Sequence, residues 1–257
     1  MCNLFGVSGT EPIRLNEYLK TFFSNSPSHP NGWGIAVFRG NEISIEKEPM
    51  EASKSNYLRE RLKAPLEAAE LMAHIRLATR GHMEYENCHP FVRRDITGRN
   101  WTMIHNGTVF HCPVLNKYIF SQQGQTDSER ILLYIVDCID AASKEKGGRL
   151  TEKERFSVVD KAVCEVAPQN KVNLILYDGS LFYVHKNCRK SLFQKKVGSS
   201  MLFSTVRLDR EGWQDLPLTT LLAYKKGRLR FTGTNHGQEY IYDPKDMDMI
   251  YLDYSGL

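Results

Sequence analysis

The second residue of the chain, Cys2, carries the first side chain that could do chemistry. Removal of the initiator methionine, which a small second residue permits, would make Cys2 the first residue of the mature chain. Its free α-amine would have a pKa of about 8, close to the value of about 8.5 for a thiol, so the amine could take the thiol proton. Nucleophile and base would then belong to one residue. A cysteine can also stand here by chance, so a site needs further residues.

A His-Asn-Gly sequence at residues 105–107 offers hydrogen-bond donors for a developing anion. It follows an apolar stretch, 101–104, that we predict to be a strand. The Asn106 carboxamide and the Gly107 backbone N–H could hold the oxyanion of a tetrahedral intermediate, because glycine permits close approach to the backbone. The Asn-Gly pair could equally be the tight turn of a β-hairpin. The pattern alone leaves both interpretations open.

Two charged residues could bind an amino acid by its two charged groups. Arg76 lies at the end of a predicted strand over 71–77, and Asp127 opens a predicted helix. A guanidinium binds a carboxylate through two parallel hydrogen bonds, and a carboxylate accepts hydrogen bonds from an ammonium. Taken singly, the arginine could be a surface ion pair and the aspartate could complement the helix dipole.

Cysteine and histidine residues between 88 and 112 raise the question of a metal. None of them has the spacing of two to four residues typical of structural zinc, so we predict no metal and no cofactor. The six cysteines of the chain include no close pair, and the opening residues predict no signal peptide. Cysteines without disulfide partners are typical of a reducing compartment, so we expect a cytoplasmic protein. We expect four of them, Cys88, Cys112, Cys138 and Cys164, to be small buried apolar residues.

Composition describes an ordinary globular protein. Of its 257 residues 41% are hydrophobic and 25% are charged, and the net charge of +4 is scattered along the chain. One basic cluster, 225–230, surrounds a probable hairpin turn and suits a solvated strand better than a nucleic-acid surface. No run of apolar residues approaches the 18 or so needed to span a membrane. We therefore predict neither a nucleic-acid nor a membrane partner.

The elements that must position these residues follow from hydrophobic periodicity. Short alternating or apolar runs predict strands, and a 3.6-residue period predicts helices. Thr126 and Glu129 predict a capping box at the start of one helix, and Gly40-Asn41 predicts a hairpin turn. No repeat or linker divides the chain, so we expect one domain, 1–257, with two sheets and outer helices. Predicted strands cover 2–7, 33–37, 43–45, 71–77, 101–104, 172–176, 181–183, 201–206 and 218–232; predicted helices cover 14–24, 53–63, the segment after 126, and 153–166.

Five motifs in this order resemble the class II glutamine amidotransferases, and their forms are similar to the stand-alone YafJ-like branch. They are NLFG after Cys2, HIRLATRG at 74–81, NCHPF at 87–91, IHNGT at 104–108 and QTDSE at 125–129. The resemblance implies an α+β fold of the N-terminal-nucleophile hydrolase type. That fold is a four-layer αββα sandwich with two mostly antiparallel sheets between helices.

The resemblance also implies a role for each motif residue. Cys2 would be the nucleophile with its own amine as base, and Asn106 and Gly107 would form the oxyanion hole. The others would bind or frame the substrate: Arg76 the α-carboxylate with Thr79 nearby, Asp127 the α-ammonium, and His74, His89 and Trp33 as supporting residues. The chain departs from the synthetases of the family at Leu77, where they have Trp, and at Arg80, where they have His.

The implied reaction is cleavage of the γ-amide of glutamine or of a γ-glutamyl compound through a γ-glutamyl thioester, with release of glutamate. Alternatives are a γ-glutamyl peptide hydrolase of the glutathione or ergothioneine-pathway type, and a non-catalytic γ-glutamyl-binding or regulatory subunit. The expected partner is a small-molecule substrate. A separate protein could accept the ammonia, as fused domains do in the synthetases, or the enzyme could be a simple amidohydrolase.

Overall fold

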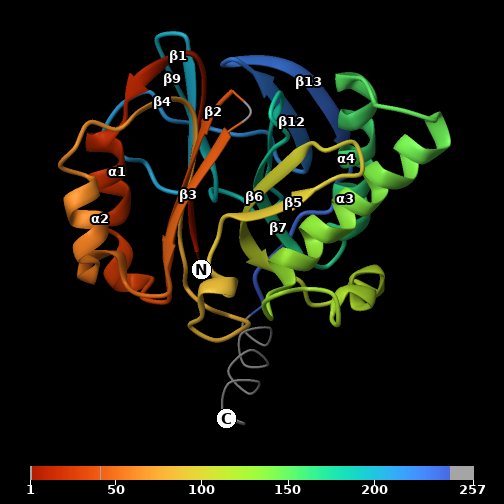
Figure 1. Ribbon diagram of the computed structural model, residues 1–257, viewed down its shortest axis with the longest axis horizontal. Coiled ribbons are helices and arrows are strands. Elements are labelled where there is room, and N and C mark those ends of the chain that lie inside the picture. The colour runs from red at the N-terminus through yellow and green to blue at the C-terminus, as the bar shows by residue number, and fades with distance from the viewer. Residues whose placement is uncertain (1, 41, 244–257) are drawn as a thin grey trace.

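The computed structural model describes residues 2–40 and 42–243 (Figure 1). The strands are β1 (Asn3–Arg14), β2 (Trp33–Arg39), β3 (Glu42–Glu48), β4 (Glu67–Ile75), β5 (Phe91–Arg94), β6 (Asn100–Thr108), β7 (Lys171–Tyr177), β8 (Phe182–His185), β9 (Phe193–Val197), β10 (Ser200–Ser204), β11 (Gln214–Asp215), β12 (Thr220–Lys225) and β13 (Arg228–Asn235). The α-helices are α1 (Asn16–Phe23), α2 (Asn56–Arg61), α3 (Asp127–Lys146) and α4 (Glu152–Val166). Within the described chain, no helix is long and apolar enough to cross a membrane.

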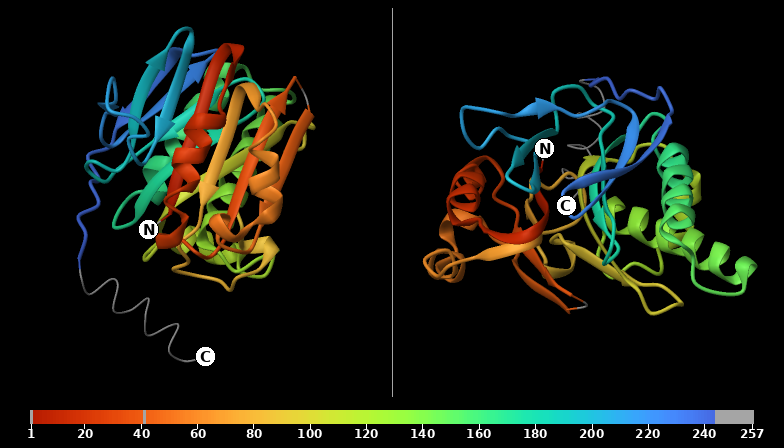
Figure 2. Two further views of the ribbon diagram at one scale, coloured as in Figure 1. Left: turned by 90° about the vertical axis from the view of Figure 1, so that its left-hand side faces the viewer. Right: turned by 90° about the horizontal axis from the view of Figure 1, so that it is seen from above.

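The strands form two facing sheets. In the described residues one sheet has seven strands in the order β11-β9-β10-β1-β4-β2-β3, and the other has six in the order β13-β12-β8-β7-β6-β5. Neighbouring strands in both sheets are antiparallel. Helices α1 and α2 cover the outer face of the seven-stranded sheet, and α3 and α4 cover the six-stranded one (Figures 1 and 2). The expected αββα sandwich is confirmed.

Alternation along each strand divides the apolar residues among three cores. Successive side chains of a strand point to opposite faces. In β1, Phe5 and Val7 pack under α1 and α2, whereas Leu4 packs between the sheets. In β6, Met103 packs against α3 and Ile104 faces the inter-sheet core. Residues of even number in β1, β4 and β6 therefore point between the sheets, which decides where the polar residues at their ends meet.

Local sequence signals start the helices of the second layer. Thr126 caps α3 and its side chain accepts a hydrogen bond from the Glu129 backbone N–H at 3.2 Å. The predicted capping box is only half formed, because the Glu129 carboxylate accepts from the N–H groups of Gln123 and Gly124 instead. That carboxylate holds the loop before α3. A full capping box is present at α4, between Thr151 and Glu154.

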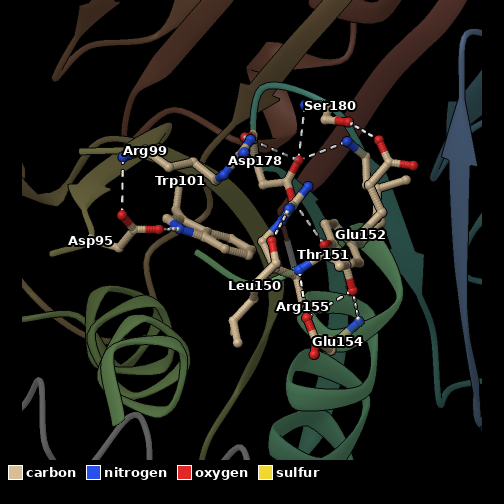
Figure 3. Close-up of polar contacts among 12 residues, drawn as sticks. Asp95, Arg99, Trp101, Leu150, Thr151, Glu152, Glu154, Arg155, Asp178 and Ser180 are labelled. Carbon is tan, nitrogen blue, oxygen red and sulfur yellow. Dashed lines mark hydrogen bonds and ion pairs between the residues drawn. The ribbon is translucent and has the colours of Figure 1, made fainter. Parts of the chain in front are cut away.

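A buried carboxylate fixes the turn between β7 and β8 to α4 (Figure 3). Asp178 Oδ2 accepts from Arg155 Nε at 2.6 Å and from the Tyr183 hydroxyl at 3.0 Å. Its Oδ1 accepts from the backbone N–H groups of Ser180 and Leu181. Every bond of this carboxylate is therefore internal, and the network anchors one end of β7, whose other end reaches the candidate site.

The hairpin of β2 and β3 also follows the prediction. Trp33, Ile35 and Val37 share one face of β2, in the core under α1 and α2. Gly40 has a φ of +59°, as a tight turn requires. The other predicted turn residue, Asn41, lies outside the described residues.

Candidate active site

The predicted polar residues meet at one end of the space between the sheets. Asn3 of β1 pairs with Ile75 of β4, so the next residues along, Cys2 and Arg76, adjoin each other at the ends of these two inner strands of the seven-stranded sheet. Across the space, Asn106 and Thr108 lie at the end of β6. Even-numbered side chains face inward on all these strands. The start of the described chain lies at this end, between the sheets (Figure 1).

The Cys2 thiol is partly buried and directed across the end of β4. Its Sγ donates a hydrogen bond to the Leu77 carbonyl oxygen at 3.3 Å. Burial raises the pKa of the Cys2 thiol, while that hydrogen bond and the positive charges of Arg76 and Lys171 act in the opposite direction. Burial outweighs these effects, so the pKa of the thiol lies above its ordinary value, and the positive charges only partly offset the cost of forming the thiolate.

The His-Asn-Gly sequence lies within β6. Asn106 pairs with Asn173 and Gly107 pairs with Val172 of β7, so the strand continues to Thr108. The alternative of a hairpin turn is wrong, and the predicted end of this strand at 104 is four residues short. Periodicity missed the extension because its residues are polar or lack a side chain.

Gly107 is required by close packing rather than by an unusual backbone angle. A Cβ atom built on Gly107 would lie 1.8 Å from the Lys171 carbonyl oxygen and 2.5 Å from His105 Nε2. Glycine inside a strand commonly marks such a close backbone approach. The His105 ring is held on the helix side of the sheet, where its Nδ1 lies 2.9 Å from Ser128 Oγ. Asn106 and Gly107 are thus fixed in position by β7 and α3.

Lys171 belongs to this group of residues, and our sequence analysis did not find it. It is the first residue of β7, opposite Thr108, and it is only 2% exposed. Its Nζ donates to Asn106 Oδ1 at 3.4 Å, and its charge interacts with the Cys2 thiol. Lys171 therefore connects the two halves of the site. No local signal identified it, because a lysine at the first position of a mostly apolar strand is common on protein surfaces.

Arg76 holds the loop that follows β4. Its Nη1 donates to the carbonyl oxygens of Asn31 at 3.4 Å and His82 at 2.8 Å. Its Nη2 donates to those of Arg80 at 2.7 Å and Gly81 at 2.8 Å. Four backbone acceptors thus occupy the terminal N–H groups. Carboxylate binding by Arg76 stays a prediction, and it would require some of these bonds to be exchanged.

Thr79 and Asp127 lie on the six-stranded side of the site. The Thr79 hydroxyl is 3.1 Å from that of Thr108, which closes the loop after β4 onto the end of β6. Asp127 is buried at the first turn of α3, and its Oδ2 accepts from the Val109 N–H at 2.6 Å. The Asp127 charge interacts with the guanidinium of Arg130, which lies three residues further along α3. Both predicted residues therefore flank the segment that follows Gly107.

Two buried imidazoles lie behind the site. The rings of His74 and His89 stack with centroids 4.0 Å apart, and Gly34 gives the His89 backbone room. Burial lowers the pKa of His74 to about 3 and also lowers that of His89, so both rings are neutral at pH 7. Their burial suits the supporting role predicted for them. Among the described residues, no three His, Cys, Asp or Glu side chains form a metal-binding group.

Trp33 does not join this group. It lies on the outer face of β2, where its ring packs edge-on against Phe23 at 6.0 Å and its Nε1 donates to Glu48 at 3.0 Å. Odd-numbered residues of β2 face α1 and α2, so the prediction that Trp33 shapes the pocket is corrected. The glycines on either side are the residues that face inward: a Cβ on Gly32 would meet Cys88 Sγ at 2.7 Å.

Two antiparallel sheets packed between helix layers define the N-terminal-nucleophile type of fold. The family comparison then gives the particular group: the model for class-II glutamine amidotransferases matches residues 1–197. The chain therefore belongs to the class II glutamine amidotransferase family.

Relatives of known sequence agree with this family. A candidate glutamine amidotransferase of Haemophilus influenzae is 29% identical over 72% of this chain, and the match spans 63% of that protein's own length. YafJ of Escherichia coli K12, described as a candidate glutamine amidotransferase, is 29% identical over 75% of this chain and 74% of its own.

Solved structures share the fold at lower identity. A predicted glutamine amidotransferase from Pseudomonas aeruginosa superposes with a TM-score of 0.61 at 18% identity, covering 89% of this chain and 99% of that one. The glutamine phosphoribosylpyrophosphate amidotransferase of Bacillus subtilis gives a TM-score of 0.66 at 14% identity, covering 91% of this chain and 49% of that one. At these identities the likeness concerns the fold.

Proposed function

We propose that this protein is a Cys2-dependent amidohydrolase that cleaves the γ-amide of glutamine or of a γ-glutamyl compound. The proposal rests on the placement of Cys2 beside the start of β1 in one sheet and of Asn106 and Gly107 near the end of β6 in the other. Lys171 connects them, since its ammonium lies 3.4 Å from Asn106 Oδ1 and its charge acts on the thiol. In this proposal the substrate amide would lie between the nucleophile on one sheet and the oxyanion donors on the other.

In the proposed reaction, Met1 is first removed and the α-amine of Cys2 takes the thiol proton. The sulfur then forms a bond to the γ-carbonyl carbon, and the carbonyl oxygen becomes an oxyanion. The C–N bond breaks as the ammonium returns its proton to the leaving nitrogen, which leaves a γ-glutamyl thioester. Water, deprotonated by the same amine, attacks the thioester; the C–S bond breaks and glutamate departs.

Asn106 Nδ2 and the Gly107 backbone N–H are the proposed oxyanion donors. Both groups belong to a strand whose register is fixed by β7, so they need no rearrangement when charge develops on the oxygen. Preorganised donors of this kind act in a partly desolvated site, where a hydrogen bond to an anion is stronger than in water.

The amino-acid end of the substrate would lie beside Asp127, whose carboxylate accepts from the α-ammonium. Two guanidinium groups are candidates for the α-carboxylate. That of Arg76 is held by carbonyl oxygens, as described above. That of Arg80 lies near Arg130, and its Nε has no hydrogen-bond partner among the described residues. We propose Arg80 as the closer fit, because it can bind a carboxylate without dismantling the loop.

Turnover with a substrate panel tests the proposal. Glutamate, ammonia and amine would be measured with glutamine and with γ-glutamyl dipeptides, after intact mass has established whether the chain begins at Cys2. Cys2→Ser should abolish turnover. Asn106→Ala should fold normally and lose about 10²–10³ in kcat. Cys164→Ser, on α4 in another layer, is the matched control and should keep full activity.

The products also separate the candidate reactions. Glutamate with ammonia would indicate a glutaminase-type activity, which a partner protein could couple to transfer. Glutamate with an amine or a shorter peptide would indicate a γ-glutamyl peptide hydrolase. Binding of γ-glutamyl compounds without any turnover, and no adduct at Cys2 from a glutamine-like diazoketone, would refute the enzyme and favour a binding subunit.

A further inference from the structure

Lys171 is a buried cation whose surroundings belong to the site. Its side chain leaves the first position of β7 toward the inter-sheet space, on the same face as Thr108 across the strand pair. Burying an ammonium costs free energy unless polar groups compensate it. Groups that act on the ammonium include Asn106 Oδ1 and the thiols of Cys2 and Cys188. The His105 ring lies against the Lys171 backbone, with its Nε2 3.2 Å from the carbonyl oxygen.

The contact between Lys171 and Asn106 fixes the orientation of the carboxamide. An ammonium has three donors and no acceptor, so the atom of Asn106 that faces it must be the oxygen. The 3.4 Å contact with Oδ1 accordingly turns the Nδ2 group away from the lysine. Asn106 could act as an oxyanion donor only in this orientation, because the flipped amide would present an acceptor to the anion.

We propose that Lys171 is a positioning residue that holds the Asn106 carboxamide with its NH2 group toward the reacting oxygen and keeps a positive charge beside the Cys2 sulfur. The claim about the Asn106 carboxamide rests on the proposed function. The claim about the charge beside the Cys2 sulfur concerns the thiol itself and can be tested without any substrate.

Burial also makes this lysine sensitive to pH. Desolvation lowers the pKa of Lys171 to about 8, and the nearby Cys188 and Cys2 thiols act in the opposite direction. A lysine with a lowered pKa is charged below that value and becomes neutral above it. Neutral Lys171 can accept as well as donate, so it no longer dictates how Asn106 is turned. The kcat of the wild type should therefore fall as pH rises through about 8.

A double-mutant cycle tests the positioning role. Lys171→Met should lower kcat about 10–100-fold, since one oxyanion donor is worth about 10²–10³ and this variant only misorients it. In an Asn106→Ala background, Lys171→Met should cause less than about a threefold further loss. Lys171→Gln, which can still donate to Oδ1 without titrating, should recover part of the rate and lose the fall of kcat above pH 8.

Lys186→Met provides the control for loss of a buried ammonium. Lys186 is 1% exposed and bonds to Asp215, a half-exposed carboxylate on another strand. Its effect on kcat should multiply with that of Asn106→Ala. If the effects of Lys171→Met and Asn106→Ala also multiply, or if the alkaline fall of kcat persists in both Lys171 variants, the positioning role is wrong.

Alkylation of Cys2 by iodoacetamide, followed by peptide mapping, separates this inference from the proposed function. The rate at pH 7.5 should fall about 3–10-fold in Lys171→Met relative to wild type, because a nearby cation favours the thiolate. Far-UV circular dichroism and thermal melting would establish that the variant is folded. An unchanged alkylation rate in a folded variant would overturn the electrostatic part. A wild type without turnover on any γ-glutamyl compound would instead refute the proposed function.

Discussion

Replacing Gly107 by alanine is the sharpest test of how the two strands of the site are packed. The new Cβ would lie 1.8 Å from the Lys171 carbonyl oxygen, whereas ordinary contacts begin at 3.4 Å. The obstructing atom is backbone and cannot rotate aside, so β6 and β7 must move apart where Asn106 and Lys171 lie. Overpacking typically costs about 1–3 kcal/mol, and a backbone clash falls at the upper end. With about 2–4 °C per kcal/mol for a chain of this size, Tm should fall by about 6–12 °C.

Thermal melting and turnover would be measured together on the same preparations. The displaced Gly107 N–H and Asn106 carboxamide should lower kcat by at least about 100-fold, even well below Tm. Gly148→Ala is the matched control, because a Cβ there has nothing within 4 Å and Gly148 lies outside the sheets, after α3. A Gly107→Ala protein that melts within about 1 °C of wild type would refute this account of the packing. Normal turnover by a destabilised variant would refute the oxyanion role alone.

Two further predictions concern charges. Burial raises the pKa of Glu70 from 4.5 to about 8; this stabilises the fold below pH 4.5 and the stabilisation is lost as pH rises through 8. In urea titrations Glu70→Gln should therefore match wild type near pH 4 and be more stable by about 3 kcal/mol at pH 7; a stability difference that does not change with pH would contradict this. Arg76→Ala should lower both Tm and kcat, because the carbonyls of residues 80–82 lose their donor at a cost of about 2–3 kcal/mol. Arg80→Ala should raise KM for glutamine about tenfold or more at unchanged Tm, and an unchanged KM would exclude it as the carboxylate ligand.

Much of the framework could be predicted because its signals are local. The alternation of Trp33, Ile35 and Val37 predicted both the strand and the face they share, and the Thr126 side chain starts α3 as its sequence indicates. The order of the motifs also predicts that Cys2 and Asn106 belong to one site, and this stays a prediction. These inferences need only the period of a strand, the chemistry of a cap or the order of short motifs.

The surroundings of three residues could not be predicted, because they depend on contacts far apart in the chain. Lys171 contacts Asn106, which lies 65 residues earlier in the chain, and the residues adjacent to Lys171 in the sequence do not indicate a functional polar residue. Trp33 was assigned to the pocket because glycines of the motif flank it, yet the period of β2 turns it to the other face. An arginine is a common carboxylate ligand, but the loop that follows Arg76 folds back, and its carbonyl oxygens accept the hydrogen bonds of the guanidinium.

The distance between the two halves of the site is set by side-chain packing, since no ladder of backbone hydrogen bonds joins the described strands of the two sheets. Facing sheets pack about 10 Å apart, a distance that side chains from both must fill. Gly6 of β1 allows the Phe182 ring of the other sheet to lie against its backbone, because a Cβ there would stand 2.9 Å from the ring. Thr205 accepts from the Leu4 N–H at 3.1 Å and so fixes the start of β1, two residues from Cys2. The start of β1, which carries the proposed nucleophile, is therefore held against the other sheet by the packing of the inter-sheet core.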